Sequence, residues 1–365
     1  MRHASRTAAS SGRRPYVAFI QAASTLALLV GVTTSTSAEA LTIRPTFDSS
    51  ITRLSNAATI ESAFDAAAAQ LDRAFANPTT VNITVSWGSV AGKALPSGDI
   101  SSSTNNLSGP YSYASVVSYL TAEAKANPAD ASLASAVAHL PKTDPLKTTQ
   151  FEIPYAEAKA IGMLPRTLAI TDGYVGFSSS AHYDFSPTGG ITSGAYDFEA
   201  LAEHEMEEVL GRSTGLVSTS PAWAMPFDLL RYSKPGVSSF AYGTEAYFSV
   251  NGGVTNLGDF SYTGGGDRSD WLSGTAVSDL QSAYLSTSRG YALSTSDLTA
   301  LDALGWGGWV SPGGSLSLGP SVLSPISGAG AVPEPSTWAT LIAGLGLVGL
   351  VIRRRRQGAE SAALS

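Results

Sequence analysis

The sequence contains no cysteine in its 365 residues. Disulfide bonds, thiolate catalysis and every zinc site with a cysteine ligand are therefore excluded. Histidine is nearly as scarce, with four in the chain: His3, His139, His182 and His204. A metal site with three histidine ligands would need almost all of them. Charged residues are also few, at 14% against about 25% in ordinary soluble domains, but 43% of the residues are hydrophobic, which is enough for a substantial core.

The first 40 residues have the pattern of a secretory signal peptide. Four arginines, at positions 2, 6, 13 and 14, precede a largely apolar run from Tyr16 to Val32, and Ala38-Glu39-Ala40 forms a small-residue cleavage site. An N-terminal membrane anchor is the alternative, but the apolar run is shorter than the ~20 residues that a spanning helix needs. We therefore expect residues 1–40 to be removed during export.

The C-terminal segment resembles the PEP-CTERM sorting signal of exported bacterial proteins. The motif Val332-Pro333-Glu334-Pro335 is followed by an uncharged stretch up to Ile352 and then by arginines 353 to 356. The resemblance implies that residues 332–356 hold a motif, a short membrane helix and an arginine cluster, and that an exosortase processes them during export. Positive charge stays in the cytoplasm, so the body would lie outside the inner membrane, in the cell envelope or the exterior. A permanent C-terminal anchor is the alternative.

The remaining body, residues 41–310, is expected to be one domain. A Gly-, Ser- and Pro-rich tether at 311–331 joins it to the sorting signal, and residues 357–365 form a short tail. Residues 41–335 contain 14 Lys and Arg against 27 Asp and Glu, a net charge of −13. Such an acidic body argues against nucleic-acid binding, because both partners would be negatively charged.

Hydrophobic periodicity predicts an α+β body. Apolar residues recur at helical spacing in 56–76, and 80–87 alternates as a strand, so the body is expected to open with an α/β subdomain. Further helices are expected at 112–124, 132–139, 154–163 and 296–304, and short strands at 167–170 and 174–178. The C-terminal half is rich in glycine and aromatic residues, which predicts an irregular subdomain.

Residues 197–210 form the segment with the clearest chemistry. Asp197 is a helix-capping residue and Gly211 follows the last turn, so a helix is predicted between them. One stripe of this helix is apolar and is expected to pack on the core: Phe198, Ala202, Met206 and Val209. Another stripe, at i, i+4 and i+8, is acidic and is expected to face solvent: Glu199, Glu203 and Glu207.

His204 and Glu208 occupy a third face of this helix, one turn apart, and Glu205 lies about 100° around from His204. Two ligands at i and i+4, with a glutamate directly after the first, have the geometry of the HExxH zinc helix, in which that glutamate activates the metal-bound water. Here Glu208 stands where the second histidine would be. A carboxylate is an acceptable zinc ligand, although its charge makes the ion a poorer Lewis acid. The alternative is a half-buried His204 without metal and a Glu208 paired with Arg212.

The segments around this helix resemble a family of zincin-like metalloproteases that carry PEP-CTERM signals and have an HExxE helix followed by Gly-Arg. The similarity consists of Thr171 to Phe177, Tyr196 to Phe198, His204 to Arg212, Asp228 to Tyr232, Tyr247 to Gly253, Asp267 with Asp270-Trp271, and Leu301 to Trp306. It covers nearly the whole body. The resemblance implies a zincin-like fold with a metal-binding helix, bound Zn²⁺, and peptidase activity on a protein or peptide substrate.

The helix supplies only two metal ligands, so a third must come from elsewhere. In metzincins a third histidine follows the helix, but Thr214 stands at that position. Asp228 is the first choice because it is a lone acid in an apolar run; an ion pair with Arg231 or a capping role is the alternative. His182 is the second choice. Met225 lies in a segment similar to the metzincin methionine turn, with plain core packing as the alternative.

These observations predict an exported zinc endopeptidase in which His204, Glu208 and Asp228 hold the metal and Glu205 is the general base. Arg231 or Tyr232 is a candidate for stabilising the oxyanion. The competing hypothesis is a non-catalytic surface protein on a decayed zincin scaffold, whose 14 Tyr and 6 Trp could pack against extracellular polysaccharide. The Asp- and Gly-rich stretch 251–270 also suggests calcium, but its spacing matches neither an EF-hand nor a nonapeptide repeat.

Overall fold

The computed structural model describes residues 40–147, 150–186, 188–218, 223–264, 266–273 and 278–308. The predicted signal peptide up to residue 39, the tether, the sorting signal and the C-terminal tail lie outside these ranges. Within the described ranges, every helix is too short or too polar to cross a membrane.

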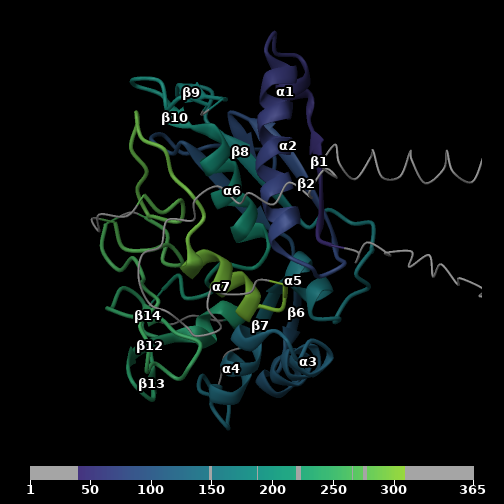
Figure 1. The fold of residues 1–365 in the computed structure, drawn as a ribbon, viewed down its shortest axis with the longest axis vertical. Coiled ribbons are helices and arrows are strands. Elements are labelled where there is room, and N and C mark those ends of the chain that lie inside the picture. The colour runs from purple at the N-terminus through teal and green to yellow at the C-terminus, as the bar shows by residue number, and fades with distance from the viewer. Residues whose placement is uncertain are drawn as a thin grey trace, which may run out of the picture. The chain divides into compact units, whose positions relative to one another are not determined.

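A four-stranded sheet with the order β1-β2-β8-β5 packs against the helix that carries the candidate site (Figure 1). Its strands are β1 (Thr42–Phe47), β2 (Thr80–Trp87), β8 (Gly173–Phe177) and β5 (Ser101–Asn105). β1, β2 and β8 are parallel, whereas β5 pairs antiparallel with β8. Among the described strands, β5 is therefore an edge of this sheet.

Two helices pack against this sheet and against each other, α2 (Ala57–Ala74) and α6 (Phe198–Val209) (Figure 1). α2 connects β1 to β2, and its buried residues recur at helical spacing: Ile60, Ala63, Phe64, Ala67 and Leu71. The alternating residues Val81, Ile83 and Val85 of β2 are also buried. α6 contacts β5 and β8, so the motif helix lies beside the sheet edge.

The described residues form two further sheets of three or four short strands, and two two-stranded sheets, β9 with β10 and β3 with β4. The order β11-β7-β6 joins β11 (Trp223–Ala224), β7 (Gln150–Pro154) and β6 (Leu107–Tyr111), next to α3 (Tyr113–Ala126), α4 (Ala131–His139) and α5 (Tyr155–Ala160). The order β13-β12-β14-β15 joins β13 (Val237–Ser238), β12 (Arg231–Lys234), β14 (Tyr247–Phe248) and β15 (Gly258–Asp259). The remaining elements are α1 (Ser49–Thr52), β3 (Ser89–Val90), β4 (Lys93–Ala94), β9 (Tyr183–Asp184), β10 (Tyr196–Asp197), the 3₁₀ helix Pro226–Leu230 and α7 (Thr295–Ala303).

The mixed α+β class predicted from the sequence is confirmed. The predicted strand 80–87 coincides with β2, and the helices expected at 56–76 and 296–304 correspond to α2 and α7. The prediction of a strand at 167–170 is wrong. Leu168 and Ile170 donate their amide hydrogens to the carbonyls of Pro165 and Leu168, so local turn bonds replace pairing with another strand.

Candidate metal centre

The α6 helix begins and ends where the sequence predicts. The Asp197 carboxylate accepts a hydrogen bond from the Ala200 amide, which caps the first turn. After the last turn, Gly211 has φ +122° and lies so close to Glu157 that a Cβ atom would come within 2.8 Å of its carboxylate oxygen. The chain therefore needs glycine at the end of this helix.

The predicted solvated stripe on α6 is wrong, because α6 is covered on that side too. Glu203 and Glu207 are 3% and 0% exposed, and only Glu199 is half-buried. Helix α2 packs against α6 there, and the Asp297 charge of α7 acts on both buried glutamates. Helical periodicity identifies an acidic face, but only the neighbouring elements decide whether water reaches it.

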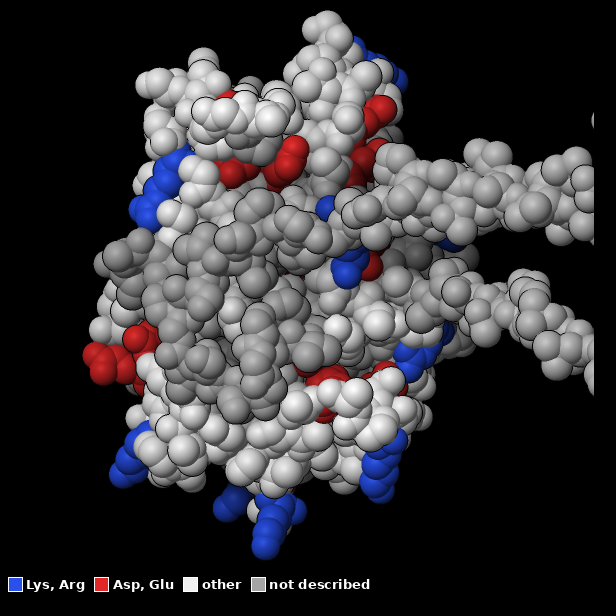
Figure 2. Space-filling view, in the orientation of Figure 1, with Lys and Arg blue, Asp and Glu red and all other residues white. Residues whose placement is uncertain are grey.

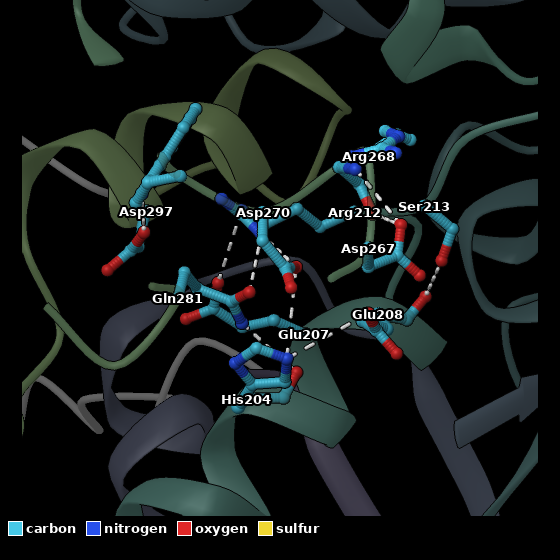
Figure 3. A network of polar contacts seen from close by, with 12 residues as sticks. His204, Glu207, Glu208, Arg212, Ser213, Asp267, Arg268, Asp270, Gln281 and Asp297 are labelled. Carbon is cyan, nitrogen blue, oxygen red and sulfur yellow. Dashed lines mark hydrogen bonds and ion pairs between the residues drawn. The ribbon is translucent and has the colours of Figure 1, made fainter. Parts of the chain in front are cut away.

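Two side chains of α6 and one from a distant part of the chain converge at one point (Figure 3). The Nε2 atom of His204 lies 3.9 Å from Oε1 of Glu208 and 3.8 Å from Oδ1 of Asp270. All three potential ligand atoms lie within 4.8 Å of one another, and all three residues are at least nine-tenths buried. His204 and Glu208 were predicted to share a metal, and Asp270 was not.

The His204 ring and the Glu208 carboxylate are each held by a hydrogen bond from outside this group. His204 Nδ1 lies 2.8 Å from the carbonyl oxygen of Leu280, which can only accept, so Nδ1 carries the hydrogen and Nε2 presents its lone pair to the two carboxylates. The Gln281 amide donates to the His204 carbonyl at 3.0 Å. Ser103 of β5 donates to Oε2 of Glu208 at 2.6 Å and leaves Oε1 facing His204.

Burial raises the pKa of both carboxyl groups. For Glu208 the pKa rises to about 7, with the Asp267 charge adding to the effect of burial and His204 opposing it. The pKa of Asp270 is raised well above its ordinary value for the same main reason, and its Oδ1 atom is buried without a hydrogen-bond partner. A positive charge close to two such buried carboxylates favours their ionised forms.

The donor set fits a divalent metal such as zinc. Imidazole nitrogen and carboxylate oxygen are both zinc ligands, and two tetrahedral ligands at about 2.1 Å from an ion lie roughly 3.4 Å apart. The distances of 3.8 and 3.9 Å are longer than this by only a few tenths of an ångström. The Asp270 oxygen that accepts no hydrogen bond and the carbonyl-bound Nδ1 of His204 are the features expected at such a site.

Glu205 lies next to this group, in the same cleft. The cleft has a volume of about 440 Å³ and is lined by His204, Glu205, Glu208 and Asp270 together with Ser101 and Ser102 of β5. Glu205 is 4% exposed, and burial and the Glu208 charge raise its pKa well above the ordinary value, while a hydrogen bond with Ser101 lowers it. A carboxylate held in this way at the wall of a cleft is placed to accept a proton from a bound molecule.

A buried arginine links α6 to the segment that carries Asp270 (Figure 3). Arg212 is 0% exposed; its Nη1 lies 3.7 Å from Asp270 and its Nε lies 3.8 Å from Glu207. Nη1 also donates to the Gln281 side chain, and the guanidinium lies 4.2 Å from the ring centroid of Trp271. The alternative pairing of Arg212 with Glu208 is therefore not formed.

The structure does not bring Asp228 to this group, which corrects the predicted third ligand. Asp228 is fully buried and accepts hydrogen bonds from the Thr214 hydroxyl and from the amides of Gly215 and Met225. These three donors use both carboxylate oxygens and cap the 3₁₀ helix Pro226–Leu230. The capping role that the sequence left open is thus the one observed.

The other candidates also lie away from the cleft. His182 is exposed, and the Arg231 guanidinium lies 4.1 Å from the ring centroid of Phe260 and donates to the Arg268 carbonyl. Tyr232 is buried, and none of these three residues lines the cleft around His204. Arg231 and Tyr232 are therefore not placed to stabilise an oxyanion in this structure.

Asp270 is the potential ligand that reasoning from the sequence missed. It is separated from His204 by more than sixty residues and lies in an irregular stretch, where no periodicity predicts the direction of a side chain. The available signal was its position directly before Trp271, whose ring packs on Arg212. In the described part of 251–270, the only residue that belongs to a group of three potential ligands is Asp270, and its group is the one with His204 and Glu208. The structure therefore gives no support for a separate calcium site in this described part.

Comparison with known proteins identifies only the C-terminal signal. Residues 331–356 match the PEP-CTERM protein-sorting motif, as the sequence indicated. The motif supports export of the protein and recognition by an exosortase, with sorting to the cell envelope or surface. No curated protein and no solved structure is significantly similar to the chain.

Proposed function

We propose that the exported body is a zinc-dependent peptidase with a zincin-like fold. The observation that carries the proposal is the convergence of His204, Glu208 and Asp270 on one point, with Glu205 beside them in a cleft of about 440 Å³. A bound zinc ion would polarise a substrate carbonyl and make a water molecule more acidic. The mixed sheet with the HExxE helix packed beside its antiparallel edge strand supports the zincin-like assignment.

The side chains of this chain divide the work in the proposed reaction. His204, Glu208 and Asp270 hold the ion, and the Leu280 carbonyl fixes the tautomer of His204 that can bind it. Glu205 takes a proton from the attacking water at its carboxylate and passes it to the leaving amine nitrogen. The buried Arg212 keeps Asp270 directed toward His204 when no ion is bound.

The sheet edge favours an extended peptide as the substrate. Within the described ranges, β5 pairs with β8 on one side only, and its residues Ser101 and Ser102 line the cleft next to Glu205. A peptide that adds to such an edge forms main-chain hydrogen bonds, which are independent of its sequence. A peptide bound in this way would place its backbone carbonyls next to His204, Glu208 and Asp270.

Metal content tests the proposal directly. Protein purified without chelator should contain close to one zinc per chain by elemental analysis, and His204→Ala should contain almost none. His139→Ala is the matched control, because His139 lies at the end of α4 and contacts neither Glu208 nor Asp270. Absence of bound zinc in the unmutated protein, even after zinc addition, would contradict the proposal. Stoichiometric zinc without hydrolysis of a broad peptide library would favour a non-catalytic binding protein instead.

A further inference from the structure

A second cavity, with a volume of about 250 Å³, lies beside the N-terminal half of α6 and shares no lining residue with the metal cleft. Its walls come from α2, from residues 190 and 191 before β10, from α6 and from residues 290–293. The proposed peptidase reaction uses none of these residues. The cavity therefore needs an explanation of its own.

Glu203 is the unusual residue of this cavity. It lines the wall and is 3% exposed, yet it has no hydrogen bond and no ion pair within the described part of the chain. The nearest basic residue that acts on it is Arg73, which is exposed and forms no ion pair with it in the described structure. Burying an ionised carboxylate without a partner is costly, and because Glu203 lines the cavity, a ligand that enters it can supply the missing partner.

The surroundings of Glu203 attract positive charge. Asp197 and Glu199 also line the cavity, whereas no lysine or arginine does so among the described residues. Figure 2 shows acidic side chains gathered in the hollow between the β9 and β10 loops and helix α2. The guanidinium of Arg289 lies 5.4 Å from the ring centroid of Tyr291, which lines the cavity. The wall of the cavity therefore already forms a favourable contact with one cation.

The size and walls of the cavity argue for an organic cation. A volume of about 250 Å³ exceeds by several fold the ~30 Å³ that one water molecule takes up. The carboxylates of this cavity do not form a group of three whose ligand atoms all lie within 4.8 Å of one another. They are therefore not arranged around a small ion, unlike the carboxylates near His204. Ile191, Ala200 and Leu293 supply apolar wall, which suits an alkyl stem that ends in a charged group.

We infer that this cavity binds an alkylguanidinium or alkylammonium group, whose charged end pairs with Glu203 and whose stem packs on Ile191 and Leu293. The group can come from a basic side chain of a polypeptide or from a small organic amine, because both present the same chemistry. The two oxygens of Asp197 are already used by the amides of Ala200 and Tyr291, so Glu203 and Glu199 are the carboxylates left to receive the ligand.

Calorimetric titration of the purified full chain with n-butylguanidinium, n-butylammonium and the neutral n-butylurea tests this inference. Both cations should bind with a Kd of about 1 mM or tighter, and butylurea should bind at least about tenfold more weakly. The cation affinity should be the same with and without a chelator, since the cavity is separate from the metal cleft. This independence separates failure of this inference from failure of the proposed peptidase function.

Matched variants localise the binding. Glu203→Gln should weaken cation binding by about tenfold or more, and Glu199→Gln should weaken it less, because Glu199 is only half-buried. Glu205→Gln makes the same change two residues away, in the other cavity, and should bind the cations as the unmutated chain does. A blocked Gly-Gly-Arg-Gly-Gly peptide that competes with butylguanidinium would identify a polypeptide as the source; binding of the small cations alone would identify a free amine. Equal binding of butylurea, or unchanged cation affinity in both Glu203→Gln and Glu199→Gln, would overturn the inference.

Discussion

Glu205→Gln is the substitution that most directly tests whether the metal centre is catalytic. Glutamine has nearly the same shape as glutamate but cannot take a proton from water. Glu205 is 4% exposed and lines the cleft beside Glu208, so little bulk water is available to replace it as the base. General-base catalysis contributes about 10² to 10⁴-fold, so kcat/KM should fall by at least about 10²-fold, equivalent to about 2.7 kcal/mol.

The structure also predicts that this loss is not caused by unfolding. Burial is the main effect that disfavours ionised Glu205, and the Glu208 and Asp270 charges disfavour it further. Replacing a carboxylate in this position by a neutral amide should therefore leave the stability of the metal-free protein unchanged or slightly higher. Zinc content should also stay near the unmutated level, because His204, Glu208 and Asp270 are intact.

The assay is hydrolysis of a quenched fluorescent peptide library, with metal content measured on the same samples. Glu157→Gln is the matched control, because Glu157 is 0% exposed and its carboxylate has no hydrogen-bond partner, but it does not line the cleft. It should change kcat/KM by no more than about twofold. If Glu205→Gln keeps kcat/KM within about threefold at full zinc occupancy, Glu205 is not the general base and the reasoning from the cleft is refuted.

Four further predictions test other parts of the structure. Asp270→Asn should lower zinc affinity by about tenfold or more, whereas Asp228→Asn should destabilise the fold by about 1–3 kcal/mol with little direct effect on zinc affinity, as calorimetric titration and urea unfolding would show; the reverse pattern would restore Asp228 as the ligand. Arg212→Met removes the buried cation beside Asp270 and should cost about 3–5 kcal/mol without zinc and measurably less with zinc, because the ion then neutralises that carboxylate; an equal cost in both states would contradict this role. Burial raises the pKa of Asp72 to about 6, so its contribution to stability should be present below pH 4 and lost as pH rises through 6, by about 1 kcal/mol after solvent screening; Asp72→Asn should remove this pH dependence in urea unfolding, and an unchanged profile would refute it. Removal of the chain from Pro333 onward should prevent delivery to the surface without changing the unfolding transition, as fractionation and urea unfolding of the truncated protein would show, and normal delivery would contradict the sorting role.

Local sequence patterns determine much of the fold. The alternation of Val81, Ile83 and Val85 predicts β2 with its observed bounds, because a strand repeats every two residues. Asp197 and Gly211 set the ends of the motif helix, since capping and positive φ are properties of single residues. The i, i+4 spacing placed His204 and Glu208 on one face for the same reason, and the C-terminal signal is likewise a linear pattern.

Tertiary structure alone decided which residues complete the site and which acids meet water. Asp270 reaches His204 because an irregular stretch folds back onto α6, and nothing periodic in that stretch indicates the direction of its side chain. Asp228, a lone acid in an apolar run, instead accepts hydrogen bonds from nearby backbone amides. These bonds reduce the free-energy cost of burying a carboxylate near a helix start. Glu203 and Glu207 look solvated on a helical projection but are buried, because burial depends on what packs against the helix. Here α2 packs against α6, although it precedes α6 by more than a hundred residues in the chain.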